Sequence, residues 1–456
     1  MWPLLGWGSD DYSQADIPGG LTNVVGISAG MYHSLAVGTD GTVTAWGAGT
    51  TDSGTLPNYG QASVPDGLSN VVAVAAGSYH SLAWRVDGTV VAWGAGATNS
   101  GVSPYYGQAM VPAGLSNVVA VAAGAYHSLA LKSDGTVAAW GAGTTNTGVS
   151  PDNGQALVPA GLSNVSGVAA GSYHSLALKT DGTVAAWGAN SFGQTNVPGG
   201  LTNVAAVAAG YAHSLALLGD GTVVAWGFNN AGQTNVPGGL SNVGAVAGGF
   251  FHSLALAADG TVVAWGSTNY NLTNIPAGLT NAVAIAGGSF HNLILESDGR
   301  PTLTVQPVSQ AAVPGTTIRL LALAAGLQPL SYQWCLNGSD LVGATAPALL
   351  LSHLQPLQAG SYTVVITNAA GSVTSAAATL TVLGSPISLN ASLVGQEVLI
   401  SFPSETGLSY LLEYKHSLDD PAWTSLPPAV AGTGGVMVLQ DTNTPADSRY
   451  YRLRGE

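Results

Sequence analysis

The chain has 456 residues, of which 46% are hydrophobic and 7% are charged, and its formal net charge is −14. This length is sufficient for several domains, each with its own core. Nucleic-acid binding and membrane insertion are disfavoured, because 9 Lys and Arg face 23 Asp and Glu and no apolar run reaches the length of a membrane span.

Three motifs recur in residues 1–300: a histidine, an Asp-Gly pair and a Trp-Gly pair. Each occurs seven times, with spacings of 47 or 39 residues. A period of about 40 residues made of short strands is typical of propeller blades. The histidines are His33, His80, His127, His174, His213, His252 and His291, and the tryptophans are Trp7, Trp46, Trp93, Trp140, Trp187, Trp226 and Trp265.

Each repeat contains recognisable strand patterns. Residues Val71–Ala76 are apolar and small, residues His127–Leu131 alternate, and residues Thr89–Gly94 follow an Asp-Gly pair. Asp-Gly between two such runs predicts a tight hairpin, because that turn needs positive φ. A fourth strand is expected around Gln194–Pro198, which gives four-stranded blades whose Ala- and Gly-rich first strands converge on an axis.

The two ends of the repeat region complement each other. The last unit stops at the Asp298-Gly299 pair without its Trp-Gly strand, while Pro3–Gly8 is an orphan copy of that strand. Joining them closes the ring and leaves no long unpaired edge. The sequence therefore predicts an all-β fold whose first 300 residues form a seven-bladed β-propeller closed by the N-terminal strand.

The repeat VAAGAYHSLALKSDGTVAAWG (Val121–Gly141), with GQTNVP further on in the shorter units, resembles the regulator of chromosome condensation repeat. The resemblance covers residues 1–300 and is closest to the compact bacterial members, which include a secreted propeller that inhibits β-lactamases. It implies a propeller fold and says less about activity, because one fold serves many functions.

Residues 301–384 resemble a bacterial immunoglobulin-like β-sandwich. By that resemblance Trp334 is the core tryptophan and Tyr362 the corner tyrosine. Ala322 and Val364 occupy the positions where the family's disulfide cysteines are expected.

Residues 385–456 alternate with strand period and resemble a small C-terminal β-sandwich of secreted bacterial proteins, of fibronectin type III-like form. The single cysteine, Cys335, cannot form an internal disulfide and is expected to pack beside Trp334. No signal peptide is visible at the start of the chain. Low charge, abundant Thr, Ser and Asn, and the bacterial-style sandwiches favour an extracellular or cell-surface location.

The seven histidines allow two interpretations. They could form a metal ring or an acid–base array, or they could hold neighbouring blade segments together by hydrogen bonds. Seven symmetric copies without a paired carboxylate or a second ligand at metal-like spacing favour the structural interpretation. We therefore expect no catalytic residue, no metal and no cofactor.

Recognition is expected where the repeats differ. Six of the seven residues before the histidines are aromatic, and Tyr211 is expected to substitute where Ala212 breaks the series. By strand parity they rim one face of the propeller. In the β-lactamase-inhibiting relative, the equivalent face binds the partner protein. The alternative to a binding role is that these rings only pack on neighbouring turns. The candidates are Tyr32, Tyr79, Tyr126, Tyr173, Tyr211, Phe251 and Phe290.

Three consecutive connections after Trp-Gly are eight residues longer than the others. They are expected to raise a wall on the same face, and loops on a rigid scaffold commonly carry binding residues. The residues of this wall are Tyr59, Tyr105, Tyr106, Asn58 and Asp152.

The leading functional hypothesis is a non-enzymatic extracellular binding or adhesion module whose aromatic face binds a protein or a glycan. One alternative is a structural subunit of a filament or surface layer, assembled when the N-terminal strand completes a neighbour's ring. The other alternative is an inhibitor of a secreted enzyme. Enzyme activity is not expected, since no nucleophile elbow, zinc motif or phosphate loop is present.

Overall fold

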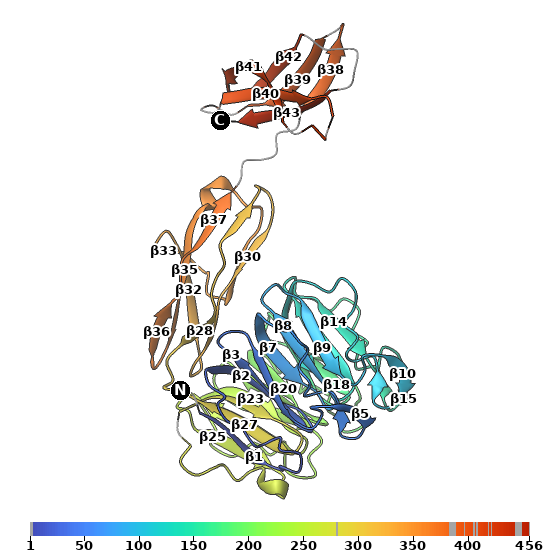
Figure 1. The fold of residues 1–456 in the computed structure, drawn as a ribbon. Helices are drawn as coiled ribbons and strands as arrows, with labels where there is room; N and C mark the ends of the chain where they lie inside the picture. Colours follow the sequence, from blue (N-terminus) through green and yellow to red (C-terminus); the bar gives the residue numbers. More distant parts are fainter. Residues whose placement is uncertain are drawn as a thin grey trace. The chain divides into compact units, whose positions relative to one another are not determined.

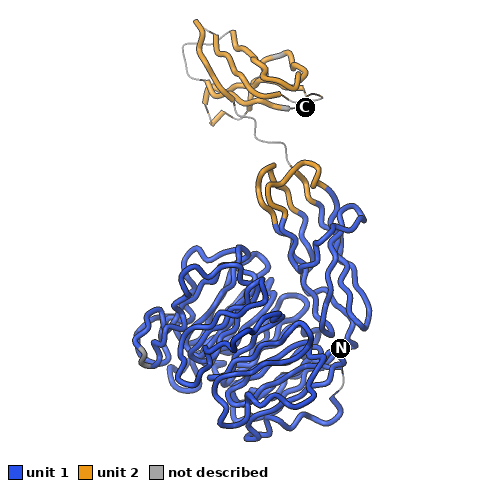
Figure 2. The backbone as a smooth tube through the Cα atoms, turned by 180° about the vertical axis from the view of Figure 1, so that it is seen from behind, with its two compact units in different colours: residues 1–309, 319–350, 360–379 blue, residues 310–318, 351–359, 380–456 orange. Residues whose placement is uncertain are grey.

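The computed structural model describes residues 3–279, 281–382, 389–395, 397–404, 406, 409–417, 419–420, 422–442 and 449–455. The chain divides into two compact units (Figures 1 and 2): residues 1–309, 319–350 and 360–379, and residues 310–318, 351–359 and 380–456. The predicted boundary between residues 384 and 385 lies outside the described residues, and the division into three domains stays a prediction.

The predicted all-β class is confirmed. The regular elements of the described residues are strands, apart from two short 3-10 helices, η1 (Asn269–Asn271) and η2 (Pro356–Gln358). No helix in this part of the chain has the length and hydropathy needed to cross a membrane.

Residues 4–296 form seven three-stranded antiparallel sheets, called the repeat sheets below, which follow one another around the first unit (Figure 1). The first strands are β2 (Val24–Ala29), β7 (Val71–Ala76), β12 (Val118–Ala123), β17 (Val165–Ala170), β20 (Val204–Ala209), β23 (Val243–Gly248) and β26 (Ala282–Gly287). The second strands are β3 (His33–Gly38), β8 (His80–Arg85), β13 (His127–Lys132), β18 (His174–Lys179), β21 (His213–Leu218), β24 (His252–Ala257) and β27 (His291–Glu296). The third strands are β4 (Val43–Gly47), β9 (Val90–Gly94), β14 (Val137–Gly141), β19 (Val184–Gly188), β22 (Val223–Gly227), β25 (Val262–Gly266) and β1 (Leu4–Gly8).

The third strand of the last repeat sheet comes from the start of the chain. β1 pairs antiparallel with β27, with Leu4 opposite Leu295 and Gly8 opposite His291. The indole of Trp7 donates to the carbonyl of Leu272 at 3.1 Å. Residues almost 300 positions apart in the sequence thus complete one sheet.

The expected fourth strand is wrong. Gln194–Pro198 lies in turns, and each repeat sheet has three strands. The segment cannot extend the sheet, because the backbone carbonyl of Gln194 accepts hydrogen bonds from Ser214 and from the indole of Trp226. Pro198 also lacks an N–H to donate to a neighbouring strand.

The core of this region lies between neighbouring repeat sheets. The second strand of each sheet has five buried residues in a row, as in β8. Leu35 of β3 packs in one cluster with Ala83 and Trp93 of the next sheet. Each sheet thus buries its faces against its two neighbours, as layered β-structures require.

The predicted Asp-Gly turns also connect neighbouring sheets. The carboxylate of Asp87 accepts from the backbone N–H of Thr89 at 2.9 Å and from its hydroxyl at 2.6 Å. Gly88 adopts φ 79°, and its carbonyl accepts from the backbone N–H of Val118 at the start of the next sheet. The glycine is required because few other residues adopt that conformation at low cost.

Three two-stranded hairpins occupy the long connections. They are β5 (Asp52–Thr55) with β6 (Asn58–Tyr59), β10 (Asn99–Val102) with β11 (Tyr105–Tyr106), and β15 (Asn146–Val149) with β16 (Asp152–Asn153).

Residues 302–382 form shorter sheets. Trp334 is fully buried and its indole donates to the carbonyl of Ala346 at 2.9 Å. Ala322 and Val364 are also fully buried. Apolar side chains thus pack at the two positions where the family's disulfide cysteines were expected. Cys335 is buried, but it follows Trp334 directly in the strand Ser331–Leu336 and therefore faces the other side of that strand, where its thiol donates to Oδ1 of Asp340 at 3.2 Å. The strands are β28 (Thr302–Val305), β29 (Gln310–Ala312), β30 (Ile318–Leu321), β31 (Leu323–Ala325), β32 (Ser331–Leu336), β33 (Ser339–Asp340), β34 (Ala348–Leu351), β35 (Gly360–Asn368), β36 (Gly371–Thr374) and β37 (Ala378–Val382).

The last residues of the chain form two three-stranded sheets with a core of Ile400, Phe402, Tyr410 and Leu412. One sheet contains β38 (Asn390–Val394), β39 (Glu397–Pro403) and β42 (Val436–Asp441), and the other contains β40 (Ser409–Lys415), β41 (Thr424–Ala431) and β43 (Tyr450–Gly455).

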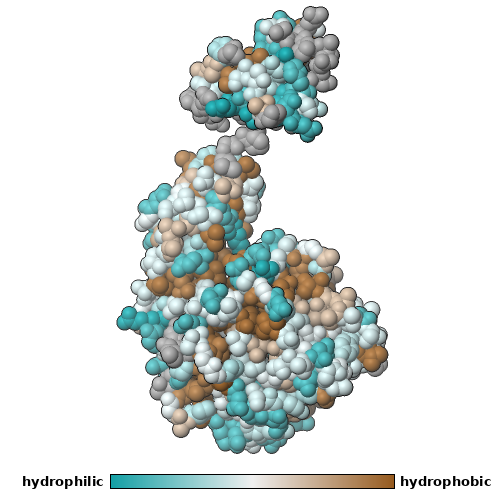
Figure 3. All heavy atoms as spheres, viewed as in Figure 1, coloured by the Kyte–Doolittle hydropathy of each residue, from teal (hydrophilic) through white to brown (hydrophobic). Residues whose placement is uncertain are grey.

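The surface reflects the low charge of the chain. Hydrophobic and hydrophilic residues are interspersed over the face seen in Figure 3, and much of it has intermediate hydropathy. With only 7% charged residues, the chain covers its surface with neutral polar and small side chains.

The glycine three positions before each repeat histidine leaves room for the histidine ring. A Cβ on Gly77 would lie 2.5 Å from the carbonyl oxygen of Gly124 in the next sheet and 2.7 Å from Nδ1 of His80. Both distances are far below van der Waals contact. The sequence Gly-x-x-His is therefore a steric requirement for neighbouring sheets to approach each other.

Gly77→Ala is expected to lower the free energy of unfolding by at least about 3 kcal/mol, because the new Cβ meets backbone that cannot rotate away. Gly199→Ala is the matched control, since a Cβ there meets no atom within 4 Å. The control should be unchanged or up to about 1 kcal/mol more stable. Urea unfolding measures both variants, and equal losses in the two would contradict the steric argument.

Candidate functional site

A buried hydrogen-bond network joins each repeat sheet to the next. The hydroxyl of Ser81 donates to the backbone carbonyl of Gln61 at 2.8 Å, and the indole of Trp93 donates to the same carbonyl at 2.9 Å. Nε2 of His33, in the preceding sheet, lies 2.8 Å from the Ser81 hydroxyl. One glutamine carbonyl therefore organises a serine, a tryptophan and the histidine of the neighbouring sheet.

The network is repeated seven times and returns to its start. The histidine contacts run His33–Ser81, His80–Ser128, His127–Ser175, His174–Ser214, His213–Ser253, His252–Asn292 and His291–Ser34. The carbonyls at the centre belong to Gln14, Gln61, Gln108, Gln155, Gln194, Gln233 and Leu272.

The serine fixes the form of the histidine. A serine hydroxyl has one hydrogen, and here it goes to the glutamine carbonyl, so the imidazole must donate from Nε2. Nδ1 then carries a lone pair and has no hydrogen-bond partner in any of the seven rings. Asn292, which takes the place of the serine in the last repeat, supports this assignment, because its Oδ1 accepts a hydrogen bond from Nε2 of His252 at 2.6 Å.

Burial keeps these histidines neutral. Desolvation, and to a smaller extent the nearby His291, lowers the pKa of His33 to about 3. In His252 desolvation lowers the pKa to about 4, against a hydrogen bond to Asn292 that raises it. The histidines thus join the sheets, as the structural interpretation expected. The described residues contain no group of three or more His, Cys, Asp or Glu side chains placed to hold a metal ion.

At the end of the repeat sheets where the second strands begin, fifteen aromatic side chains form one connected set of ring contacts, called the aromatic face below. Its members are Tyr12, Tyr32, Tyr59, Tyr79, Tyr105, Tyr106, Tyr126, Tyr173, Phe192, Tyr211, Phe228, Phe250, Phe251, Tyr270 and Phe290. All ten candidate residues belong to it.

Four tyrosines form a row across neighbouring sheets. The ring centroids of Tyr32 and Tyr79 are 6.0 Å apart, those of Tyr79 and Tyr126 are 5.6 Å apart, and those of Tyr126 and Tyr173 are 5.8 Å apart. Each ring is half-buried. One face of the row thus packs on its neighbours while part of each ring remains accessible.

Tyr211 fills the gap that Ala212 leaves. Ala212 is buried, and the ring of Tyr211 contacts those of Tyr173 at 6.3 Å and Phe251 at 6.0 Å. Tyr211 also stacks on Phe250, with centroids 4.0 Å apart. In this repeat, the ring that continues the row therefore stands two positions before the histidine, whereas in the other repeats it stands one position before.

The hairpins bring further tyrosines to the aromatic face. Tyr59 lies edge-on to Tyr79 at 5.6 Å, Tyr106 lies edge-on to Tyr126 at 5.3 Å, and Tyr59 contacts Tyr105 of the next hairpin. Tyr59 is largely buried. Asn58 and Asp152 hold equivalent positions, and each side chain accepts from the backbone N–H of a preceding glycine.

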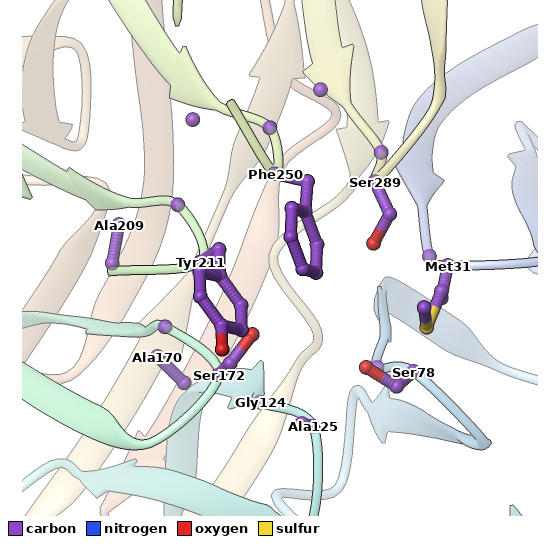
Figure 4. A pocket seen from close by; sticks show the side chains of 18 of the residues that line it. Met31, Ser78, Gly124, Ala125, Ala170, Ser172, Ala209, Tyr211, Phe250 and Ser289 are labelled. Atoms are coloured by element: carbon purple, nitrogen blue, oxygen red, sulfur yellow. The ribbon is translucent and has the colours of Figure 1, made fainter. Parts of the chain in front are cut away.

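An axial cavity of about 80 Å³ opens beside the aromatic face. Figure 4 shows side chains from different repeat sheets converging on it, with Tyr211 and Phe250 next to each other and Ser172 and Ser289 flanking them. The residues two positions before the histidines line it: Met31, Ser78, Ala125, Ser172, Tyr211, Phe250 and Ser289. Because Tyr211 and Phe250 belong to both, the cavity is continuous with the aromatic face.

Several tyrosines of the aromatic face have a pKa that is raised by burial. Burial, assisted by the charge of Tyr126, raises the pKa of Tyr173 to about 12. Burial also raises the pKa of Tyr59 and Tyr105, and the nearby carboxylate of Asp52 raises both further. The face therefore offers π surfaces and neutral hydroxyls, with acidic groups close by.

The basic residues of the repeat sheets lie at the end that also carries the Asp-Gly turns. The basic residues Arg85, Lys132 and Lys179 end their second strands, beside the Asp-Gly turns. A six-residue strand separates them by about 17 Å from the histidine end, where the aromatic face lies. Lys132 and Lys179 pair there with Asp134 and Asp181.

Sequence analysis missed five members of the aromatic face: Tyr12, Phe192, Phe228, Phe250 and Tyr270. Phe250 lies two positions before His252, which is the repeat position of Tyr211. Phe228 follows a Trp-Gly pair directly. The glutamines from Gln14 to Gln233 recur at the same spacings as the histidines. This pattern could have indicated that they belong to the hydrogen-bond network.

The fold and repeats agree with a known class of protein. Five segments of the chain match the Regulator of chromosome condensation (RCC1) repeat: residues 71–101, 118–146, 165–194, 204–233 and 245–271. The chain thus carries RCC1 repeats and the strands of propeller-type blades. No protein among the curated proteins matches it.

Among solved structures, the chain is similar to Prp20p from Saccharomyces cerevisiae, with 22% identity over 64% of this chain and 91% of that one, at a TM-score of 0.52. This similarity concerns the fold. Two receptor-kinase ectodomains also match: CR4 of Physcomitrella patens (22% identity, 58% of this chain, 68% of that one, TM-score 0.42) and ACR4 of Arabidopsis thaliana (17%, 72%, 98%, 0.40).

The low histidine pKa values predict acid lability. A histidine whose folded pKa lies below its unfolded value of 6.5 stabilises the fold fully above pH 6.5, and this stability is lost as pH falls toward the folded pKa, about 3 to 4 here. At pH 5 unfolding should take up close to one proton per network histidine, which lowers the free energy of unfolding by about 1.4 kcal/mol per pH unit for each.

Proton uptake can be measured by calorimetric unfolding at pH 5 in buffers of different ionisation enthalpy. His127→Gln should reduce the uptake by about one proton. An uptake of fewer than about three protons in the unmodified chain would contradict the burial argument.

Proposed function

We propose that the seven repeat sheets are the blades of one closed propeller and that the strands after residue 301 form two β-sandwich domains. The cyclic series of histidine contacts and the pairing of β1 with β27 support a closed ring. In this proposal the ring is a rigid platform that presents the aromatic face.

We infer that the protein is a non-enzymatic binding module and that the aromatic face is its binding surface. The observation that carries this proposal is the connected set of fifteen rings beside an axial cavity. Half-buried tyrosines lose little conformational freedom on binding and are enriched at interface hot spots. Solvent-accessible apolar patches of this kind commonly mark interaction sites.

A protein partner fits this face better than a glycan. Prp20p, the relative of similar fold, is described as binding Gsp1p and histones, which are proteins. An extracellular or bacterial surface location remains part of the proposal and rests on composition.

The binding proposal predicts that the tyrosine row is essential for ligand capture. Peptides selected from a displayed random library on the full chain should bind Tyr79→Ala/Tyr126→Ala at least about tenfold more weakly, as expected for the loss of two hot-spot rings. Tyr450→Ala, which removes an exposed ring on β43, is the control and should change affinity less than twofold.

The variant Tyr79→Phe/Tyr126→Phe keeps both rings and reports whether any loss comes from misfolding. If the selected peptides bind the double alanine variant and the full chain equally, the aromatic face is not the binding surface. A glycan array probed with the same proteins separates the two ligand classes, and capture of glycans alone would overturn a protein partner.

Self-assembly by exchange of β1 is the competing proposal, and the intrachain pairing of β1 with β27 favours a monomer. Light scattering of the full chain over a wide concentration range should give one constant mass. A mass that grows with concentration, and no longer does so after residues 1–8 are deleted, would show that β1 is exchanged between copies.

A further inference from the structure

The axial cavity has a chemistry of its own that the aromatic row does not explain. Seven residues line it, each two positions before a network histidine. They occupy the same place in their repeats but differ in residue type. Tyr211 and Phe250 stack at 4.0 Å, and Phe250 also stacks on Phe290 at 5.5 Å. Ser172 lies next to Tyr211 and Ser289 next to Phe250, and Ser78 lies farther around the cavity (Figure 4).

This combination suits a cation. Aromatic faces attract an ammonium or guanidinium through their quadrupole. Serine hydroxyls add acceptor oxygens, which such a cation needs once it leaves water. The cavity of about 80 Å³ exceeds the roughly 10–15 Å³ needed for one water molecule, so it accommodates the end of one Lys or Arg side chain.

The hairpins beside the aromatic face carry negative charge. Asp52 begins the first hairpin and Asp152 lies in the third, in the wall beside the aromatic face. The carboxylate of Asp52 acts on Tyr59 and Tyr105 and that of Asp152 acts on Tyr106, so both lie close to the rings. The basic residues of the repeat sheets are at the opposite strand ends, and nothing basic in these hairpins neutralises the two carboxylates.

We propose that the aromatic face binds a basic segment of a partner protein, with one Arg or Lys side chain of that segment in the axial cavity between Tyr211, Phe250 and the serine hydroxyls. This inference rests on the proposed function and adds the chemical class of the partner. Phosphate-bearing ligands are excluded by the same carboxylates that attract the basic segment.

The repeats themselves supply charge-removing variants that keep the fold. Asp52 accepts from the backbone N–H of Gly54, and Asn99, at the same place in the second hairpin, accepts from Gly101 in the same way. Asp152 likewise corresponds to Asn58. Asp52→Asn/Asp152→Asn therefore removes two charges and leaves both backbone contacts in place.

A control for net charge comes from the opposite end of the sheets. Asp220 and Asp259 accept from Thr222 and Thr261 in the Asp-Gly turns. Asp220→Asn/Asp259→Asn changes the total charge equally and keeps an acceptor oxygen at each turn, so it isolates the effect of position from that of net charge.

The probes are two synthetic peptides of the same Gly- and Ser-based sequence, one with two arginines and one with citrulline at both places. Titration calorimetry with the full chain at low salt should give at least about tenfold tighter binding of the arginine peptide, as expected for cation–π and charge-assisted contacts. Phe250→Ala should weaken it at least tenfold, and Asp52→Asn/Asp152→Asn about five- to tenfold. Asp220→Asn/Asp259→Asn should change it less than twofold.

Three results would overturn the inference. They are failure of the arginine peptide to bind at millimolar concentration, equal binding of the citrulline peptide, and equal losses in the two double-asparagine variants. None of them refutes the proposed function, which the library selection with Tyr79→Ala/Tyr126→Ala tests separately. Phe250→Leu keeps apolar volume without a π face and should also lose arginine binding, whereas its thermal unfolding stays close to that of the unmodified chain.

Discussion

The ring of repeat sheets depends on one shared backbone carbonyl in each repeat. The carbonyl of Gln61 accepts from Ser81 and from the indole of Trp93, and Ser81 in turn accepts from the histidine of the preceding sheet. Burying these polar groups is costly unless all are bonded, so loss of one partner would leave the others unsatisfied. This arrangement fixes the spacing of Gly, His, Ser, Trp and Gln in each repeat. It also uses the repeated histidines, which could otherwise have been metal ligands or acid–base groups.

Positions outside this network are free to differ between repeats. The residue before each histidine and the one before that share the connection between first and second strands, yet they face different surroundings. The first contributes to the tyrosine row, and the second lines the axial cavity. A common backbone therefore displays two sets of side chains, and binding chemistry can change without any change in the contacts between sheets. Function located in variable positions on a constant scaffold is a general property of such folds.

The sequence predicted those features that depend on periodic local signals. Strand positions, Asp-Gly turns and the complementary ends of the repeat region follow from patterns that recur seven times, and β1 pairs with β27 as the offset indicated. The fourth strand was wrong because Thr195 and Val197 fit a strand pattern, whereas the segment's carbonyl is used by Ser214 and Trp226. Of the aromatic face, the row was predictable from alignment of the repeats. Phe228 was not, because it has no aromatic equivalent in the other repeats and only spatial proximity relates it to the other rings.

Asymmetry is what gives the axial cavity its character. Seven identical residues around an axis would present one kind of surface in every direction, and a single side chain entering there would have no preferred orientation. Tyr211 and Phe250 occupy two adjacent repeats and leave serine, alanine and methionine in the other five. A guanidinium is planar, with π faces and edge N–H donors that need different partners. A cavity lined by two rings and by serine hydroxyls can satisfy both. The hairpin carboxylates lie in loops that follow third strands. Departure from the repeat, rather than the repeat itself, thus determines what this face can recognise.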